Sequence, residues 1–406
     1  MSFTPSTAPS AGPLDGIRIV DLTSVVLGPI ATQVLADWGA DVIKIESPEG
    51  DLMRSNGVSR NPKMSSIFLA LNRNKRSMVL DLKKSDDAKV LRELIKTADV
   101  LVHNMRVGAI ERLGFGYHAV QELNPQIVYC AATGFDQRGP DHDKPAFDDI
   151  IQAACGLVAV GSVGREVPDF VPSLIADKTA GLAVSNAITA ALFHRERSGA
   201  GQYVEVPMLE TMTAFTLAEH MGGMTFPGST DKAGYARLLQ GGRRPARTLD
   251  GWMGLLPYTD RHWTAFFQAA GHPELGDRYS IANAAQRNQN IQALYGHLAE
   301  ILPTRTTDAW LALCQELDIP ATRIYGLDEL PSHPQLVAVG LFEESEHPSE
   351  GSICQIRPTT LFQATPATLR RHAPRLGEHT AEILKELGLM KPSAPPDISA
   401  QLKKDS

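Results

Sequence analysis

The first third of the chain alternates short apolar runs with amphipathic segments, and this alternation leaves few folds open to it. Residues 17–23 (IRIVDLT) and 41–46 (DVIKIE) have the length and composition of buried strands, and residues 28–40 between them have a helical pattern. A strand, a helix and a second strand in this order predict a βαβ unit, in which the two strands are parallel. The chain is therefore expected to be an α/β protein.

The alternation continues as far as residue 208. Further strands are expected at residues 77–83, 99–104, 127–134 and 202–208, and helices at residues 85–98 and 177–197. Ser85 is expected to cap the first of these helices, because a serine hydroxyl can accept a hydrogen bond from an unpaired N–H group at a helix start. We therefore predict a Rossmann-like, mostly parallel sheet with flanking helices.

Two domains are expected, because 406 residues with 43% hydrophobic content exceed the usual size of one. The composition changes after about residue 225, where loop-forming residues are followed by helical patterns rich in aromatic residues. We expect a disordered leader at residues 1–12, the N-terminal part of a large domain at 13–224, a smaller α+β domain at 225–330, a C-terminal segment at 331–392 and a tail at 393–406.

The charge and spacing of residues argue against several classes of function. The net charge is −7, with acids and bases mixed along the chain, so no basic stripe is present for a nucleic-acid backbone. No apolar run reaches the roughly 18 to 20 residues that span a bilayer, and the first residues lack the pattern of a secretion signal. Neither HExxH nor CxxC spacing occurs. We therefore expect a cytoplasmic protein with no nucleic-acid, membrane or metal partner.

Two common active-site motifs are also missing from the chain. No GxGxxG follows the first strand, as a dinucleotide site would require, and no GxSxG nucleophile elbow occurs. Basic residues do stand near the predicted strand ends: Arg73, Lys75, Arg76, Lys83, Arg106 and Arg112. Cations at the carboxyl ends of parallel strands suit an anionic, phosphate-bearing ligand. The alternative interpretation is that these basic residues are solvated charges on the surface and bind no ligand.

Acidic residues stand at two predicted helix starts. Asp177 lies in the segment VPSLIADKTAGLAV, and Asp148 and Asp149 lie in AFDDIIQAACGL. An aspartate at such a position commonly accepts a backbone N–H bond and complements the helix dipole, so helix capping alone explains each of them. The chain has 46 acidic residues, and composition cannot single out one of them.

Several segments occur in an order that resembles one known family. They are PLDGIRIVDLTSVVLGPIATQVLADWGADVIKIESPEGD, NRNKRSMVLDLK, ADVLVHNMRVGAIERLG, FDDIIQAACGL, ADKTAGLAVSNAITAAL and LGEHTAEILKELGL, between about residue 13 and about residue 390. Together they resemble the family III CoA-transferases, or CaiB/BaiF family, which includes formyl-CoA transferase and carnitine CoA-transferase. The resemblance implies two ring-shaped subunits that interlock as a homodimer, with a C-terminal segment that returns to complete the large domain.

The resemblance also implies a function. Members of the family move CoA between an acyl-CoA thioester and a free carboxylic acid, through an aspartyl anhydride and an aspartyl-CoA thioester. The catalytic aspartate of the family matches Asp177, and a glutamate near the active site of formyl-CoA transferase matches Asp148, for which we expect a supporting role. CoA and acyl-CoA are then substrates, and no tightly bound cofactor is expected.

The same resemblance assigns residues to CoA and to a closing loop. The expected CoA contacts are Val26, Leu27, Leu80, Asp81, Leu82, Lys83, Asn104, Met105, Arg106 and Arg112. The arginines and lysine among them suit the CoA phosphates. A loop with Gln240, Gly241, Gly242 and Arg243 is expected to close over the reacting groups, because an acyl anhydride has to be kept from water.

Some residues depart from the pattern of formyl-CoA transferase. Val26 and Ser47 stand where that enzyme has Gln and Arg, and the expected lysine is displaced to Lys144. These departures argue against a formyl or oxalyl substrate. We expect instead a larger acid, such as a four- or five-carbon dicarboxylate. Its distal carboxylate would pair with Arg243, Arg244 or Arg247.

Two other functions stay open at this point. α-Methylacyl-CoA racemases resemble these enzymes but need a His and an Asp beside the α-carbon, and Phe147 stands before Asp148 at the position of that His. A catalytically silent acyl-CoA binding protein would keep the CoA contacts without any exchange. The transferase is the preferred interpretation. The sequence identifies neither the acyl donor nor the acceptor, and it does not separate the roles of Asp148 and Asp149.

Overall fold

The computed structural model describes residues 12–239 and 243–390. Its central element is a six-stranded sheet in the order β3-β2-β1-β4-β5-β6, in which all neighbouring strands are parallel. The strands are β1 (Arg18–Leu22), β2 (Asp41–Glu46), β3 (Lys75–Val79), β4 (Val100–His103), β5 (Val128–Thr133) and β6 (Gln202–Pro207). The order changes direction between β1 and β4, and ligands of such sheets bind at the carboxyl ends of the strands at this point.

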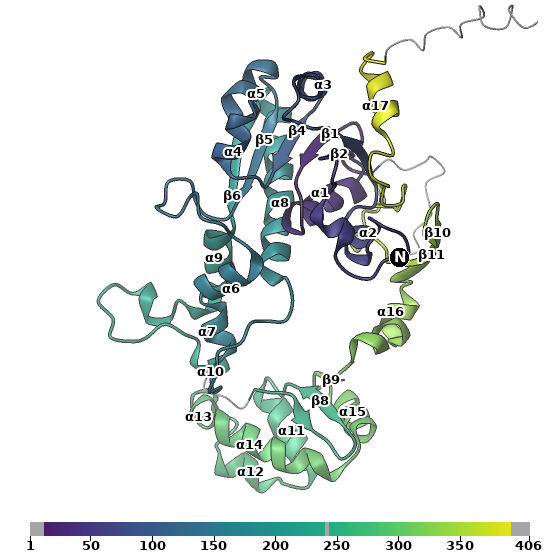
Figure 1. Cartoon of the computed structure of the whole chain (residues 1–406). Coiled ribbons are helices and arrows are strands. Elements are labelled where there is room, and N and C mark those ends of the chain that lie inside the picture. The colour runs from purple at the N-terminus through teal and green to yellow at the C-terminus, as the bar shows by residue number, and fades with distance from the viewer. Residues whose placement is uncertain (1–11, 240–242, 391–406) are drawn as a thin grey trace, which may run out of the picture. The chain divides into compact units, whose positions relative to one another are not determined.

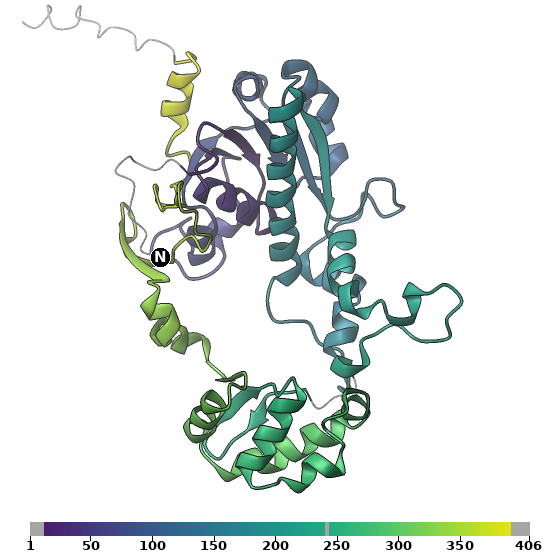
Figure 2. The same cartoon turned by 180° about the vertical axis from the view of Figure 1, so that it is seen from behind.

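Helices cover both faces of the sheet (Figure 1). On one face α3 (Ser85–Lys96), α4 (Val107–Arg112), α5 (Tyr117–Leu123) and α17 (Thr380–Glu386) share a core with the strands. On the other face α1 (Leu27–Asp37) packs against α8 (Ile175–Ser198), the long teal helix that runs along β5 and β6 in Figure 2. Because both faces are covered, the strands carry nearly continuous apolar runs.

The predicted α/β class with a parallel sheet is confirmed, and β2 has the predicted bounds. The third strand is the main difference, since it covers Lys75–Val79 and not the predicted residues 77–83. Its first two residues, Lys75 and Arg76, are charged but buried, and each forms an ion pair inside the fold. A search for apolar runs cannot detect such a strand start. Ser85 does not cap α3, because Lys84 is the cap residue and makes no capping side-chain hydrogen bond.

The C-terminal residues pack against the sheet. Residues 341–390 belong to the same unit as residues 12–155 and the range Val171–Thr213. This stretch begins with the antiparallel hairpin of β10 (Phe342–His347) and β11 (Gly351–Ile356). Further along, Glu386 of α17 pairs with Arg76 of β3 at 2.6 Å. The edge of the sheet is therefore held by residues that are distant in the sequence.

A second unit comprises Gly156–Phe170 and Ala214–Gly340. It contains a three-stranded antiparallel sheet of β7 (Ala246–Arg247), β8 (Trp252–Leu255) and β9 (Ala321–Arg323). Helices surround a core in which Trp263, Phe267 and Trp310 are fully buried. The domain boundaries predicted at residues 224 and 330 stay predictions.

The remaining elements are short, apart from the helices of the second unit. The other α-helices are α2 (Ser66–Leu71), α6 (Asp148–Ala154), α7 (Leu157–Gly161), α9 (Met208–His220), α10 (Ala236–Leu239), α11 (Asp260–Ala270), α12 (Glu274–Arg278), α13 (Ala284–Gln289), α14 (Ile291–Ile301), α15 (Thr307–Glu316) and α16 (Pro334–Ala338). The 3₁₀ helices are η1 (Leu52–Ser55), η2 (Gly222–Thr225), η3 (Leu302–Thr304) and η4 (Leu327–Ser332). Within the described part of the chain, no helix is long and apolar enough to cross a bilayer. The same residues contain no cluster of His, Cys, Asp and Glu that could hold a metal ion.

Gly181 lets α1 and α8 approach each other closely. A Cβ atom at this position would lie 2.5 Å from the carbonyl oxygen of Leu27 and 2.3 Å from Cγ2 of Ile30. Both distances are far below van der Waals contact, and the first involves backbone that cannot rotate away. Because residues four apart share one face of a helix, this contact also sets Asp177 opposite the start of α1.

We expect Gly181→Ala to lower the free energy of unfolding by roughly 1–3 kcal/mol, because α1 and α8 have to move apart to admit the methyl group. Chemical denaturation followed by circular dichroism measures this loss. Gly108→Ala in α4 is the matched control, because its Cβ would meet only Nη1 of Arg112 at 3.5 Å. An equal loss in both variants would contradict the prediction.

Candidate active site

The loop after β1 forms one side of the candidate site, and buried charges hold it. Lys44 Nζ lies 2.8 Å from the Asp51 carboxylate and donates to the carbonyl oxygen of Thr23 at 2.8 Å. Asp51 also accepts a hydrogen bond from the N–H of Val25 at 3.1 Å. Val25 has a φ of 71°, which β-branched residues rarely adopt. The ion pair therefore holds the loop in a conformation that its own residues disfavour.

The same buried network continues to Asp21 of β1. Its carboxylate accepts hydrogen bonds from the hydroxyl groups of Thr23 and Thr32 and lies 3.4 Å from Lys75 Nζ. Burial alone would raise the pKa of Asp21, but Lys75, Lys44 and the two hydroxyls hold this pKa below its ordinary value. Burial lowers the pKa of Lys75 to about 8, against the attraction of Asp21. Both groups are therefore charged and paired at neutral pH.

The first three residues of the predicted basic cluster do not form a ligand site. They precede or begin β3, so they lie at the amino end of that strand and not at its carboxyl end. All three are buried, and each pairs with an aspartate: Arg73 with Asp37, Lys75 with Asp21, and Arg76 with Asp41. The alternative of solvated surface charges is wrong for them too, since these cations are internal structural ion pairs.

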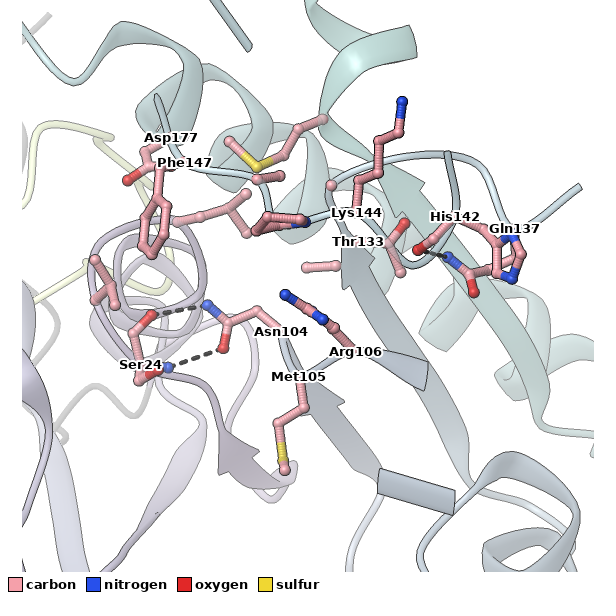
Figure 3. A pocket seen from close by; sticks show the side chains of 17 residues that line it. Ser24, Asn104, Met105, Arg106, Thr133, Gln137, His142, Lys144, Phe147 and Asp177 are labelled. Carbon is pink, nitrogen blue, oxygen red and sulfur yellow. Dashed lines mark hydrogen bonds between the residues drawn. The ribbon is translucent and has the colours of Figure 1, made fainter. Parts of the chain in front are cut away.

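A pocket opens at the carboxyl ends of β1, β4 and β5 (Figure 3). Five of the predicted site residues line it: Leu27, Asn104, Met105, Arg106 and Asp177. The Asn104 side chain accepts a hydrogen bond from the N–H of Ser24 at 3.0 Å and donates one to its carbonyl oxygen at 2.8 Å. This pair of bonds ties the loop after β4 to the loop after β1.

The other predicted residues do not line this pocket. Val26 is buried next to it as the cap residue of α1, and Arg112 lies at the far end of α4. Leu80, Asp81, Leu82 and Lys83 follow β3, at the edge of the sheet. Arg243 belongs to the second unit, and Gln240, Gly241 and Gly242 lie outside the described residues.

The pocket also has lining residues that the sequence pattern does not single out. They are Ser24, Val25, Ala132, Thr133, Gly134, Gln137, His142, Pro145, Ala146 and Met208. Most of them follow β1 or β5 in the chain. The rule that ligands bind beyond the carboxyl ends of parallel strands was the available signal, and it applies to every loop at that edge.

Asp177 occupies the first turn of α8, but it does not cap the helix, because the cap residue is Leu174. Asp177 is only 8% exposed, and within residues 12–239 and 243–390 no hydrogen bond reaches its carboxylate. Burial raises the pKa of Asp177 to about 7, and the negative charges of Asp148 and Asp149 add to this effect. The carboxylate is therefore poised to gain or lose a proton near neutral pH.

Asp148 and Gln152 of α6 hold the backbone around Asp177. Asp148 accepts a hydrogen bond from the N–H of Asp177 at 2.9 Å and another from Gln152 Nε2 at 2.6 Å. Gln152 also donates to the carbonyl oxygen of Val171 at 3.2 Å and accepts from its N–H at 3.0 Å. Asp149 is exposed. Of the two aspartates, Asp148 is therefore the one that contacts Asp177.

The two ends of the pocket differ in character (Figure 3). The apolar ring of Phe147 lies beside Asp177, whereas His142 and Gln137 lie at the opposite end. Arg106 is exposed between them, and no carboxylate of the described residues pairs with it. The pocket thus combines a buried carboxylate that lacks hydrogen-bond donors with a cation that is available to an anionic ligand.

Known proteins resemble this chain over nearly its whole length. Residues 14–380 match the family model described as CoA-transferase family III. The succinate–glutarate CoA-transferase of Agrobacterium fabrum is 32% identical over 393 residues, with 95% of this chain and 98% of that protein covered. The formyl-CoA:oxalate CoA-transferase of Afipia carboxidovorans is 31% identical over 417 residues, with coverage of 95% and 96%.

A solved structure agrees with the sequence comparisons. The crystal structure of a CAIB/BAIF family protein from Brucella suis has a TM-score of 0.78 and 29% sequence identity, with 93% of this chain and 100% of that chain covered. The family that the sequence segments predicted is thereby confirmed. The chain belongs to family III of the CoA-transferases, and the protein is a transferase.

Proposed function

We propose that this transferase moves CoA between an acyl-CoA and a free carboxylic acid, and that Asp177 is the nucleophile. The environment of Asp177 carries the proposal. The carboxylate is buried, lacks hydrogen-bond donors among the described residues and lines the pocket at the switch point of the sheet. A carboxylate without donors keeps its lone pairs free for attack, and burial removes the water that would weaken it as a nucleophile.

The exchange is proposed to take four steps, with the electrons balanced in each. The Asp177 carboxylate attacks the thioester carbonyl carbon, the C–S bond breaks, and a mixed anhydride and CoA thiolate result. The thiolate attacks the aspartyl carbonyl, which releases the donor acid and leaves an aspartyl-CoA thioester. The acceptor carboxylate then attacks this thioester and expels the thiolate. Finally the thiolate takes the new acyl group from the second anhydride, and Asp177 is restored as a carboxylate.

CoA is proposed to lie along the carboxyl edge of the sheet. Arg106 supports this, because it is exposed in the same pocket as Asp177 and can pair with a phosphate or another anionic group. Lys83 and Arg112 are also exposed, which leaves both available to the CoA phosphates. CoA acts here as a substrate, and no resident cofactor is part of the proposal.

The acceptor is proposed to be a four- or five-carbon dicarboxylate. The similarity to a succinate–glutarate CoA-transferase supports this choice. A relative that acts on formyl-CoA and oxalate is nearly as similar, so overall identity does not separate the two kinds of substrate. The argument against the smaller substrate rests on Val26, Ser47 and Lys144, which depart from the formyl-CoA transferase pattern.

A racemase would need a second acid or base on the far side of the α-carbon. Phe147 lies beside Asp177, and the histidine in the pocket, His142, lies at the opposite end (Figure 3). The phenyl ring of Phe147 can neither accept nor donate the α-proton. This arrangement favours the transferase.

The active form is proposed to be an interlocked homodimer. Helix α8 supports an additional partner, because its apolar residues are not confined to the side that packs on α1. Leu182 and Phe193 of α8 are 49% and 64% exposed. Large apolar side chains that are exposed on one side of a helix commonly mark an interface with another chain.

Asp177→Ala is expected to lower the rate of CoA exchange by roughly 10³-fold or more, because no other carboxylate of the described residues lines this pocket. Incubation with acyl-CoA followed by hydroxylamine is expected to convert Asp177 to a hydroxamate, which peptide mass spectrometry detects. Asp149→Asn is the control, since Asp149 is exposed and makes no hydrogen bond with Asp177. Both variants are compared at a pH well above 7, because the charge of Asp149 also raises the pKa of Asp177. Full exchange activity in a folded Asp177→Ala variant would sink the mechanism.

The raised pKa of Asp177, about 7, predicts a pH dependence of the first step. The protonated carboxyl cannot attack, so kcat/KM for acyl-CoA should fall as the pH drops through about 7. Asp148→Asn removes a negative charge that raises this pKa, and should move the midpoint to lower pH. The amide oxygen of the variant can still accept the N–H of Asp177. A lower rate with an unchanged midpoint would show that the charge of Asp148 has no part in setting this pKa.

Interlocked rings cannot exchange subunits unless one chain unfolds. Two preparations with different affinity tags, mixed under native conditions, should therefore yield no doubly tagged dimer over hours, measured by sequential affinity capture. Denaturation and joint refolding should produce it. A light-scattering mass of one chain, or rapid exchange under native conditions, would contradict the interlocked homodimer.

A further inference from the structure

The second unit has a pocket of its own, formed by β7, β8, α14 and the residues before β7. Arg244 and Arg247 both line it. Arg243, the neighbouring arginine, does not. Of the three arginines that the sequence offers for a substrate carboxylate, two therefore line the same pocket.

Strand pairing fixes the position of Arg247. In the antiparallel pair of β7 and β8, Arg247 stands opposite Trp252. Residues directly opposite in such a pair project from the same face of the sheet, so the guanidinium and the indole share one side of the pocket. Trp252 is 54% exposed, although large aromatic side chains are usually more buried. The pocket thus has a cation beside an apolar wall that is open to a ligand.

One face of α14 forms the opposite wall. Gln292, Tyr295, Gly296 and Ala299 line the pocket and are spaced three or four residues apart, as a single helical face requires. A Cβ atom at Gly296 would meet nothing within 4 Å. The helix therefore leaves free space above this glycine.

The two arginines of this pocket have no acidic partner among the described residues. Both arginines are exposed, and within residues 12–239 and 243–390 no carboxylate forms an ion pair with Arg244 or Arg247. By contrast, Arg323 of the same sheet pairs with Asp308 at 2.7 Å. An anionic group of a ligand would supply the charge partner that Arg244 and Arg247 lack.

We propose that this pocket binds the carboxylate of a small aliphatic acid, held by Arg244 and Arg247. Guanidinium groups match the planar carboxylate with paired N–H donors. Trp252 and Leu255 offer apolar surface to a short methylene chain. The choice of a dicarboxylate as the natural acid depends on the proposed function, whereas the pocket itself does not.

Direct binding tests the pocket separately from catalysis. Glutarate is titrated into the full-length protein without CoA and followed by isothermal calorimetry, and saturable binding is expected. Arg244→Gln and Arg247→Gln should each raise Kd by about tenfold or more, because each removes a charged hydrogen-bond donor. Arg323→Gln, an arginine already paired with Asp308, should leave Kd unchanged.

A steric variant tests the pocket without changing either arginine, so its result does not depend on whether the arginine variants fold. Gly296→Leu keeps both arginines, places a side chain in the free space and should abolish binding, whereas Gly296→Ala should retain most of it. The absence of saturable binding in the wild type would overturn the proposal. So would an unchanged Kd in both arginine variants, or inorganic phosphate binding as tightly as glutarate.

Exchange kinetics show whether the bound acid is the acceptor substrate or an effector. If it is the acceptor, Arg247→Gln raises KM for glutarate and leaves kcat nearly unchanged. If it is an effector, KM is unchanged, but the response of exchange between other substrates to added glutarate is lost. Either result supports the pocket. Glutarate binding in a wild-type protein that exchanges no CoA would contradict the proposed function and leave the pocket standing.

Discussion

The geometry of the candidate site depends on the buried ion pair between Lys44 and Asp51. This pair fixes Thr23 and Val25, and the chain enters α1 directly afterwards. The start of α1 then meets α8 at Gly181, one turn beyond Asp177. Both charged side chains are at most 1% exposed, and loss of one partner from such a pair typically costs about 3–5 kcal/mol. The Lys44–Asp51 ion pair thus helps to set the position of Asp177 indirectly, through the start of α1.

Two buried aspartates show how surroundings decide the state of one residue type. Asp21 has two lysines and two hydroxyls around it, which hold its pKa below the ordinary value in spite of burial. Asp177 has two acidic neighbours and no donor to its carboxylate among the described residues, so burial raises its pKa to about 7. The first carboxylate is saturated with partners and serves the fold. The Asp177 carboxylate has no hydrogen-bond donor among the described residues, which lowers stability but leaves its oxygen atoms unoccupied.

The fold was largely predictable, because short apolar runs of a defined length indicate buried parallel strands. β2 matched its predicted bounds, and β1, β4, β5 and β6 lay within theirs. The start of β3 could not be predicted, because Lys75 and Arg76 are buried there and their partners, Asp21 and Asp41, lie far away in the sequence. The same cause misled the prediction of a phosphate-binding cluster. The sequence alone does not show whether a charged side chain is solvated, forms an internal ion pair or binds a ligand.

The sequence by itself determined the α/β class, the family and the residues that could carry the chemistry, because these depend on periodicity and on the order of segments. The tertiary structure alone decided which of those residues meet. It brought Asp177, Asn104 and Arg106 to one pocket. It also set Asp148, which accepts a hydrogen bond from the backbone N–H of Asp177, apart from the exposed Asp149, and it placed Arg244 and Arg247 in the lining of a second pocket. Burial and distance arise only when the chain has folded, and the pKa of a carboxylate depends on both.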